Sequence, residues 1–183
     1  AGVAVRNGAR EARARPARLV VGADGLRSVV ARRARLVRRR PRLRKVSLTT
    51  HGVGGAGGLD HGEMHVLDGA CFGLAPAGRG RFNLTLVVHE SRAADLGAAG
   101  PVAFFDRWLE RAPAVRDRVA GAALERPFLA SGPFDWPTRS PIGPRLALVG
   151  DAAGYYDPFT GQGVYQAMEG GRLLAAALEG IDL

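Results

Sequence analysis

Two short apolar runs, one near each end of the chain, predict buried strands that finish at a glycine. The first covers residues 17–21 and stops at Gly22, and the second covers residues 146–149 and stops at Gly150. Continuous apolar runs of this length, bounded by turn residues, are typical of buried strands. Residues 22–25 then predict a turn, because glycine accepts backbone angles that other residues avoid.

A helix is predicted after each of these strands. Residues 26–35 carry apolar side chains at roughly helical spacing, which gives a strand, a turn and a helix in succession. The second helix is predicted over residues 163–178, and its apolar side consists of Val164, Ala167, Met168, Leu173 and Leu174. The two strand–glycine units flank the middle of the chain.

The middle of the chain has a different pattern, in which short alternating or β-branched runs are separated by glycine-rich turns. The turns are predicted over residues 52–58 and 78–80. Several short strands joined by tight turns indicate an antiparallel sheet. The four predicted strands cover residues 46–51, 63–67, 70–75 and 82–88.

A helix and a proline-rich connection follow the predicted sheet. Prolines at intervals over residues 127–144 predict a connection without regular structure. The pattern as a whole predicts a mixed α/β (α+β) fold with a β-rich insertion. The helix is predicted over residues 101–111, with Pro101 in its first turn and Val102, Phe105, Trp108 and Leu109 on one face.

The composition excludes several classes of protein. The 183 residues are 46% apolar and 23% charged, which suits one domain with a core. A single cysteine, Cys71, excludes a disulfide-stapled miniprotein, and no stretch reaches the roughly 20 apolar residues of a membrane-spanning helix. The chain starts at Ala1, and residues 1–15 lack the apolar core of a signal peptide, so a cytoplasmic location is expected.

The net charge of +9 comes almost entirely from arginine, since Lys45 is the only lysine. Such a composition arises from GC-rich coding DNA without selection for charge, and the alternative is an anionic partner. Nine basic residues lie between positions 32 and 45 without interleaved aromatic residues. This run is interpreted as a solvated face, with a site for NADPH or an anionic substrate as the alternative, and no nucleic-acid contact is predicted.

The second strand–glycine unit carries the strongest chemical pattern. Gly150 lets a ligand approach the backbone, and Asp151 can accept hydrogen bonds from ligand hydroxyls. Gly163 opens a helix whose free N–H groups and positive dipole end favour an electron-rich ligand. The spaced set comprises Val149, Gly150, Asp151, Ala152, Ala153, Gly154, Pro158, Gly161, Gln162 and Gly163.

This set resembles the second FAD fingerprint of the flavoprotein monooxygenase superfamily, which includes para-hydroxybenzoate hydroxylase, the geranylgeranyl reductases and the flavin-dependent halogenases. Residues 21–28 are similar to the DG motif of that superfamily, with Arg32 close to the position of its usual arginine. The two motifs occur in the superfamily's order. The stretches 63–66, 72–76 and 83–84 resemble the substrate-side sheet of its reductase-like branch.

The resemblance implies part of a Rossmann-like FAD-binding domain with an inserted antiparallel substrate domain. Residues 1–40 and 141–183 would belong to the FAD-binding domain, and residues 41–140 to the substrate domain. The resemblance also implies that Asp151 binds the ribityl side of FAD and that Asp24 serves both FAD and NAD(P)H. The implied cofactor-binding residues are Gly22, Asp24, Gly25, Gly150, Asp151, Ala152, Pro158, Gly161, Gln162, Gly163 and Val164.

Two departures from the superfamily's pattern change the expectation. Gly154 stands where many hydroxylases carry histidine, and glycine there is more typical of reductases and halogenases. The first fingerprint, G-x-G-x-x-G after a strand, has no counterpart, because residues 52–57 fit the string but predict a hairpin turn. We therefore expect that the ADP-binding part precedes Ala1, and that this chain alone binds FAD weakly or not at all.

No catalytic side chain and no metal site are predicted. His61 and His65 lie on a predicted strand, where positions four apart are well separated, so zinc is not expected. Cys71 is interpreted as a core residue. For Tyr155 and Tyr156, contact with flavin or substrate and plain packing both stay open.

The sequence thus predicts the C-terminal portion of an FAD-dependent oxidoreductase with NAD(P)H as the electron donor. The expected substrate is a small organic or isoprenoid-like molecule. Hydroxylation by a monooxygenase is favoured over double-bond reduction of the geranylgeranyl reductase kind. The alternative from another class is a truncated remnant or a basic anion-binding module without flavin. No membrane-spanning segment is predicted, and peripheral membrane contact stays open.

Overall fold

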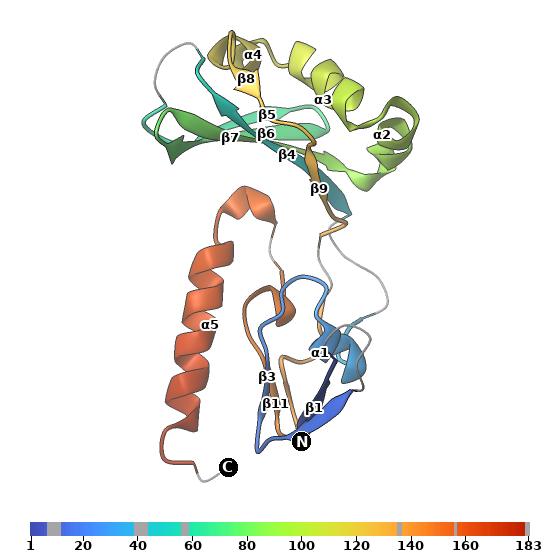
Figure 1. Cartoon of the computed structure of the whole chain (residues 1–183), viewed down its shortest axis with the longest axis vertical. Helices are drawn as coiled ribbons and strands as arrows, with labels where there is room; N and C mark the ends of the chain where they lie inside the picture. Colours follow the sequence, from blue (N-terminus) through green and yellow to red (C-terminus); the bar gives the residue numbers. More distant parts are fainter. Residues whose placement is uncertain (7–11, 39–43, 56–58, 135–136, 156, 182–183) are drawn as a thin grey trace. The chain divides into compact units, whose positions relative to one another are not determined.

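The chain divides into two compact units in the computed structural model (Figure 1). The flanking unit consists of residues 1–43 and 134–183, and the inserted unit consists of residues 44–133. The residues that the structure describes are 1–6, 12–38, 44–55, 59–134, 137–155 and 157–181.

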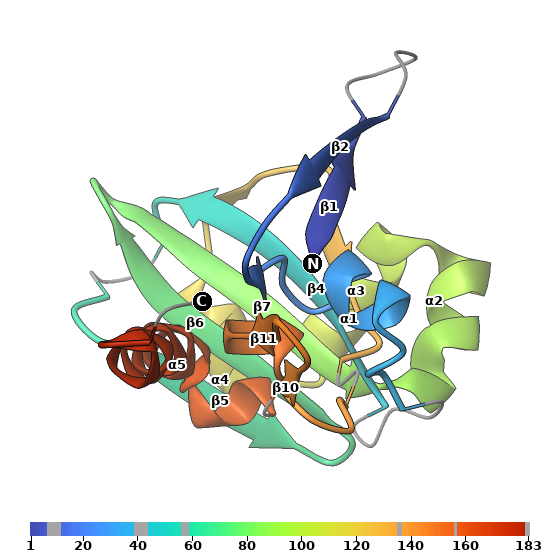
Figure 2. The same ribbon diagram turned by 90° about the horizontal axis from the view of Figure 1, so that it is seen from below.

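The inserted unit is built on a six-stranded sheet with the strand order β5-β6-β7-β4-β8, and β9 pairs with β4 beside this path. All of its pairings are antiparallel, which confirms the predicted antiparallel sheet. Figure 2 shows β4, β7 and β6 running side by side. The strands are β4 (Lys45–Val53), β5 (Glu63–Leu67), β6 (Ala70–Gly78), β7 (Arg81–His89), β8 (Ala123–Leu124) and β9 (Leu129–Ser131).

One face of this sheet forms the core with three helices. Strict alternation along β7 places Phe82, Leu84, Leu86 and Val88 on that face, because successive side chains in a strand point to opposite sides. The helices α2 (Ala93–Ala99), α3 (Pro101–Glu110) and α4 (Pro113–Arg118) lie on the same side of the sheet (Figure 1). The short helix η1 (Glu90–Arg92) leads into α2.

The structure corrects two details of the predicted elements here. Helix α3 buries Phe104, Phe105 and Trp108, whereas Val102, which was predicted on the buried face, is exposed. Phe105 contacts the ring of Phe72 edge-on at a centroid distance of 5.6 Å, which fixes the rotation of α3 against the sheet. The proline-rich connection also contains the short strands β9 and β10, because its residues between prolines pair with existing strands.

The flanking unit contains a three-stranded sheet of order β10-β11-β3 and a separate two-stranded hairpin. The three strands are β10 (Ile142–Gly143), β11 (Leu146–Leu148) and β3 (Val20–Gly22). The hairpin pairs β1 (Gly2–Val5) with β2 (Arg13–Pro16) (Figure 2). The sequence analysis did not predict it, and both strands are exposed throughout, although β1 consists of glycine, valine and alanine.

Two helices complete the flanking unit. Helix α1 (Val29–Arg33) is shorter than predicted at both ends. It begins after Ser28, whose hydroxyl accepts a hydrogen bond from the Ala31 N–H at 2.8 Å, and it ends before Arg35, which has a φ of +57°. Helix α5 (Gly163–Leu178) has the predicted bounds. Its apolar side lies open, since Val164 is 76% exposed and Met168 71% exposed.

None of the helices that the structure describes is long and apolar enough to span a lipid bilayer.

Candidate functional site

The two sequence motifs of the flanking unit meet at one edge of its sheet. Strands β3 and β11 are parallel neighbours, with Gly22 opposite Leu148. Just beyond them, the Val149 N–H donates a hydrogen bond of 2.9 Å to the Gly22 carbonyl oxygen. Because parallel strands end at the same edge, the loops that follow Gly22 and Val149 start side by side. Open α/β sheets bind their ligands at this edge.

A cavity of about 530 Å³ lies beyond this edge. Small-molecule sites occupy about 300–1,000 Å³, so the cavity has the size of a ligand site. Five of the predicted cofactor-binding residues line it: Gly25, Gly150, Asp151, Gly163 and Val164. Val149 of the second motif and Tyr155, for which the sequence analysis weighed both flavin contact and packing, also line the cavity. The sequence analysis did not single out the two other lining residues, Ala23 and Ala167, as binding residues.

The position of α5 at the cavity depends on Gly150. Its backbone has a φ of +58°, and a Cβ at this position would lie 3.1 Å from the Cβ of Ala167. Glycine therefore permits both the left-handed turn and the close approach of the helix. Helix α5 contacts the short helix η2 (Gly150–Ala152), and the first turn of α5 lines the cavity through Gly163 and Val164.

The first turn of α5 has no side-chain cap. Gln162 stands at the N-cap position without a capping hydrogen bond, and no acidic residue lies in the first turn. The Gln162 amide instead pairs with Gln166 at 3.1 Å. Since the first N–H groups of a helix have no partner within it, this turn offers donors and a positive dipole end at the cavity.

Asp151 is the acidic residue that lines the cavity. It is half-buried, and burial raises the pKa of its carboxyl. Among the described residues, no group donates a hydrogen bond to this carboxylate. A partly desolvated carboxylate without donors is costly to hold, and a ligand with hydroxyl groups would remove that cost.

Tyr155 forms another wall of the cavity. Its ring stacks on Phe134 at a centroid distance of 5.4 Å and an interplanar angle of 18°. Burial, with the negative charges of Asp151 and Asp157, raises the pKa of the Tyr155 hydroxyl to about 12. The hydroxyl therefore stays protonated at neutral pH. Tyr156 lies outside the described residues.

Asp24 does not line the cavity but holds helix α1. Its Oδ2 accepts hydrogen bonds from the Val29 N–H at 2.6 Å and the Val30 N–H at 3.3 Å. Partial burial raises the pKa of the Asp24 carboxyl, but the hydrogen bonds of Ser28, Val30 and Val29 outweigh this effect and leave its pKa lowered. In this structure the Asp24 carboxylate therefore accepts its backbone hydrogen bonds from the start of α1.

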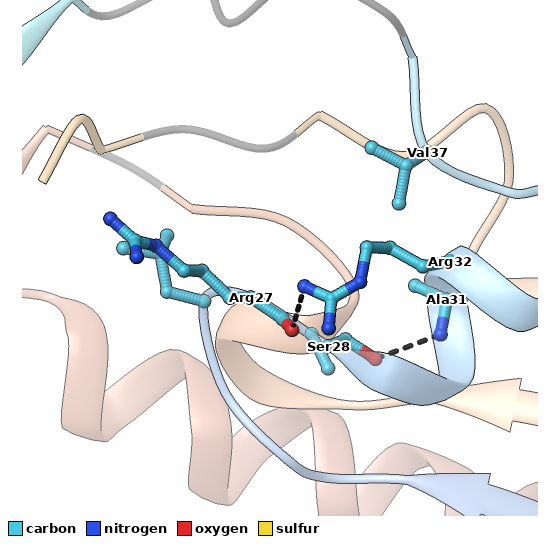
Figure 3. Close-up of a pocket in the computed structure, with 7 residues that line it drawn as sticks. Arg27, Ser28, Ala31, Arg32 and Val37 are labelled. Atoms are coloured by element: carbon cyan, nitrogen blue, oxygen red, sulfur yellow. Dashed lines mark hydrogen bonds between the residues drawn. The ribbon is translucent and has the colours of Figure 1, made fainter.

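A small pocket beside α1 connects the two motifs. It is lined by Leu26, Arg27, Ser28, Ala31, Arg32, Val37 and Ala152. Figure 3 shows the Arg32 side chain turned toward the Arg27 carbonyl oxygen, to which its Nη1 donates a hydrogen bond of 2.6 Å. Arg32, the arginine close to the DG motif, thus connects α1 to the loop between Asp24 and α1. Ala152 is buried at this small pocket and does not line the larger cavity beyond the sheet edge.

The remaining predicted residues support the site without lining the cavity. Gly22 is buried in β3, where a Cβ would lie 2.6 Å from the Leu148 Cδ2. Pro158 starts the short helix η3 (Pro158–Thr160), which Asp157 caps by accepting the Phe159 N–H at 3.1 Å. Gly161 ends this helix with a φ of +65°.

Two weaker candidate features, the basic run and the histidines, do not line the cavity. Of the basic run, residues 39, 40 and 42 lie outside the described residues, and Arg44 forms an ion pair with Glu90. His61 pairs with Asp60, and His65 pairs with Glu63. Within the described ranges, no three histidine, cysteine or acidic side chains are grouped to hold a metal ion.

Two curated proteins are similar to this chain over most of its length. Digeranylgeranylglycerophospholipid reductase 2 of Methanopyrus kandleri is 31% identical over 175 residues, which cover 91% of this chain and 43% of that protein. The protein of the same name from Methanothermobacter thermautotrophicus is 28% identical over 171 residues, covering 88% of this chain and 41% of that protein. No family model matches the chain.

Solved structures share the fold. The flavin-dependent halogenase CmlS matches 92% of this chain with a TM-score of 0.83 and 21% identity, and the match covers 31% of CmlS. PqsL, a probable FAD-dependent monooxygenase from Pseudomonas aeruginosa, matches 97% of this chain with a TM-score of 0.64 and 24% identity, covering 52% of PqsL. The halogenase PltM, whose structure holds phloroglucinol and FAD, matches 92% of this chain with a TM-score of 0.72 and 16% identity, covering 37% of PltM.

The sequence and structure comparisons point to one class of protein. The chain is similar in sequence to two digeranylgeranylglycerophospholipid reductases and shares its fold with part of FAD-dependent halogenases and a probable FAD-dependent monooxygenase. It corresponds to part of their fold, since it spans less than half the length of the two curated relatives.

Proposed function

We propose that this chain forms the flavin side of an FAD-dependent monooxygenase that is driven by NAD(P)H and acts on a small organic substrate. The observation that carries the proposal is that two groups without hydrogen-bond partners lie at the same cavity. These are the half-buried Asp151 carboxylate, which accepts no hydrogen bond from the described residues, and the uncapped first turn of α5.

The residues at the cavity fit the flavin end of FAD. Asp151 would accept hydrogen bonds from the ribityl hydroxyls, which replace the water that burial has removed. Gly25 and Gly150 present backbone without side chains, so a flat ring can come close. The N–H groups of Gly163 and Val164 would stabilise negative charge that develops on a reduced flavin.

Bound FAD would supply the redox chemistry, and the protein would supply position and polarity. The titratable groups at the cavity are consistent with these separate roles of cofactor and protein. Tyr155 stays protonated, and Asp151 is placed to accept hydrogen bonds from a ligand. We assign neither residue as a catalytic acid or base.

The open face of the inserted sheet is the proposed substrate surface. Thr49 and Thr85 meet across β4 and β7 with their hydroxyl oxygens 2.9 Å apart, and the Thr85 hydroxyl also lies 2.9 Å from the Asn83 side-chain oxygen. Exposed Met64 and Val66 lie on the same face. A polar ladder beside apolar side chains suits an organic molecule with a few polar groups.

A second candidate activity is the reduction of a carbon–carbon double bond. The specific observation in its favour is the sequence identity to the two digeranylgeranylglycerophospholipid reductases. Gly154 in the second motif is also more typical of that branch. The substrate would then be an isoprenoid-like chain, and contact with a membrane surface would follow from its chemistry.

We also propose that the chain acts as part of a longer flavoprotein in the cytoplasm. Helix α5 is 16 residues long and has no buried residue. A helix gains most of its stability from burying an apolar face, so the exposed side of α5 needs a covering that the described residues do not provide. The share of the relatives that this chain spans supports the same conclusion.

Flavin titrations of the 183-residue chain test the site. If the chain recognises only the flavin end, FMN and FAD bind with dissociation constants within about threefold of each other, because the adenosine adds no contact. Binding is expected to be weaker than micromolar. Asp151→Asn should weaken FMN binding about tenfold or more, because it removes a charged acceptor. Asp106→Asn, at an exposed aspartate on α3, is the matched control.

The outcomes separate the hypotheses. Equal FMN binding by Asp151→Asn and the unchanged chain contradicts the proposed site. Micromolar or tighter binding of FAD, with much weaker binding of FMN, contradicts a flavin-end half-site. If the NMR lines of FMN at millimolar concentration are not broadened by the chain, the result favours the alternative of a truncated remnant that binds no flavin.

A further inference from the structure

A second cavity, in the inserted unit, lies between α2 and α3. Its volume is about 180 Å³, and we call it the arginine pocket. Phe104 and Trp108 form its floor, and since they are 2% and 5% exposed they belong to the rigid core. Its lining residues are Arg92, Asp95, Phe104, Arg107, Trp108 and Arg111.

Helix periodicity places two guanidinium groups at this pocket. Arg107 lies on α3, and Arg111, the C-cap residue of α3 with helical backbone angles, follows one helical turn later, so both side chains lie on the face of Trp108. The Arg111 guanidinium lies over the Trp108 ring, 4.3 Å from its centroid. This stacking orients the group and leaves its N–H donors free for another partner.

The donors of these two arginines are not used within the described part of the chain. Arg107 forms no ion pair or side-chain hydrogen bond with the described residues, and the side chain of Arg111 contacts Trp108 alone in this way. Glu110, the acidic neighbour of Arg111, pairs instead with Arg116 at 3.4 Å. Two guanidinium groups thus line one cavity without an acidic partner of their own among the described residues.

The charges around the pocket select the kind of anion. Arg92 and Asp95 form an ion pair at 3.7 Å, so their charges cancel. The guanidinium groups of Arg107 and Arg111 then leave a local charge of about +2 at the pocket. A phosphate monoester carries about −1.5 to −2 at neutral pH, whereas a carboxylate would neutralise half of this charge. The planar fork of arginine also matches phosphate oxygens in pairs.

Another arginine-lined cavity of the inserted unit gives the contrast. It contains Arg79, Arg81 and Arg118, but Arg81 pairs with Glu125 and Arg118 pairs with Glu63. Most of its donors are therefore already used. The arginine pocket has both the free donors and the ordered aromatic floor.

We propose that the arginine pocket binds a phosphate monoester group. A water molecule occupies about 30 Å³ of liquid, so a pocket of about 180 Å³ holds a phosphate and a few further atoms, with the rest of the molecule outside. The site is separate from the proposed flavin cavity, whose lining residues belong to the flanking unit.

The experiment titrates the 183-residue chain with inorganic phosphate at neutral pH. The chain has two tryptophans, so Trp136→Phe leaves Trp108 as the reporter of the pocket. Phosphate should change Trp108 fluorescence in a saturable way and broaden the phosphorus NMR line, while sodium chloride at the same ionic strength should do neither. Arg107→Gln should weaken phosphate binding about tenfold, since it removes a charge-assisted contact.

Two further variants make the result specific. Arg107→Lys keeps the positive charge but loses the planar guanidinium group with its parallel N–H donors. Its phosphate affinity should therefore fall between those of Arg107→Gln and the unchanged chain. Arg15→Gln removes the same charge from an exposed strand, β2, and should change phosphate binding less than about twofold. Near-ultraviolet circular dichroism checks that each variant is folded.

The source of the phosphate is distinguished by two additional probes. Glycerol phosphate and adenosine monophosphate are titrated in the same way, and tighter binding of either one identifies a lipid-headgroup or a nucleotide source. The proposal is overturned if Arg107→Gln binds phosphate as tightly as the unchanged chain. It is also overturned if Arg15→Gln loses as much affinity, or if both phosphate signals are absent.

Discussion

The Val149 N–H and the Gly22 carbonyl oxygen are joined by a hydrogen bond of 2.9 Å. This bond connects the ends of two strands that lie far apart in the sequence. It places the loop that contains Asp24 beside the loop that contains Asp151. The candidate flavin site depends on this contact, because neither loop forms the cavity alone.

Replacement of Gly150 by alanine should destabilise the flanking unit. The φ of +58° costs a residue with a Cβ about 1–2 kcal/mol, and the contact at 3.1 Å with Ala167 adds to this. Urea unfolding, followed by the circular dichroism of the helices, measures the loss. Gly154→Ala is the control, since a Cβ there meets no atom within 4 Å. Equal stability of the two variants would show that Gly150 does not hold α5.

The Ser28→Ala variant should lose about 1 kcal/mol of stability. The Ser28 hydroxyl accepts the Ala31 N–H at 2.8 Å in a buried position, and loss of an N-cap costs about 0.5–2 kcal/mol. Ser28→Thr keeps the acceptor and should recover most of the loss. Denaturant midpoints of the three proteins give the comparison, and a Ser28→Thr protein as unstable as Ser28→Ala would argue against a capping role.

Glu63 should give the inserted unit an acid-sensitive contribution. Hydrogen bonds from Arg118, and then from His65, lower the pKa of its carboxyl from 4.5 to about 2. The unfolded state binds the proton more readily, so this stability is complete above about pH 4.5 and is lost as the pH falls toward 2.

The matching variant is Glu63→Gln, which keeps the shape but removes the charge. It should cost about 1–3 kcal/mol at neutral pH and much less near pH 2. Thermal melts across this pH range measure the difference. Glu179→Gln, at an exposed residue near the C-terminus, is the matched control, and a constant difference for Glu63→Gln across this pH range would refute the assignment.

Asp151 should act on stability in the opposite direction. Burial raises its pKa, so the folded state binds the proton more readily, and the stability falls as the pH rises from 3.8 through the raised pKa. Asp151→Asn should therefore raise the melting temperature of the flavin-free chain at neutral pH and leave it unchanged at about pH 3. Calorimetry at both values tests this. A lower melting temperature at neutral pH would mean that the carboxylate has a stabilising partner.

Local patterns in the sequence were sufficient for the elements with strict periodicity. Strand β5 and helix α5 have the predicted bounds, because alternation and helical spacing are properties of consecutive residues. The antiparallel sheet followed from the same patterns. The motif around Asp151 was also visible, since its glycines and small residues follow one strand directly.

Other features required the folded chain. Asp24 has the same surroundings in the sequence whether it binds a ligand or caps a helix, and only the fold places the N–H groups of Val29 and Val30 on its carboxylate. The exposure of Val102 and the burial of Phe104 depend on the rotation of α3, which the contact with Phe72 decides. Hairpin β1–β2 was not predicted, and the apolar residues of β1 are exposed in the structure.

The sequence by itself determined the class of fold, the order of the motifs and the residue types at the candidate flavin site, because these depend on composition and local spacing. The tertiary structure decided which of those residues share the cavity, and it created the arginine pocket on α3. The arginine pocket is lined by residues between positions 92 and 111, and the packing of α2 against α3 forms it. The candidate flavin cavity depends on contacts between segments distant in the chain, such as β3 with β11. Such contacts depend on how whole elements pack, and no short stretch of residues specifies them.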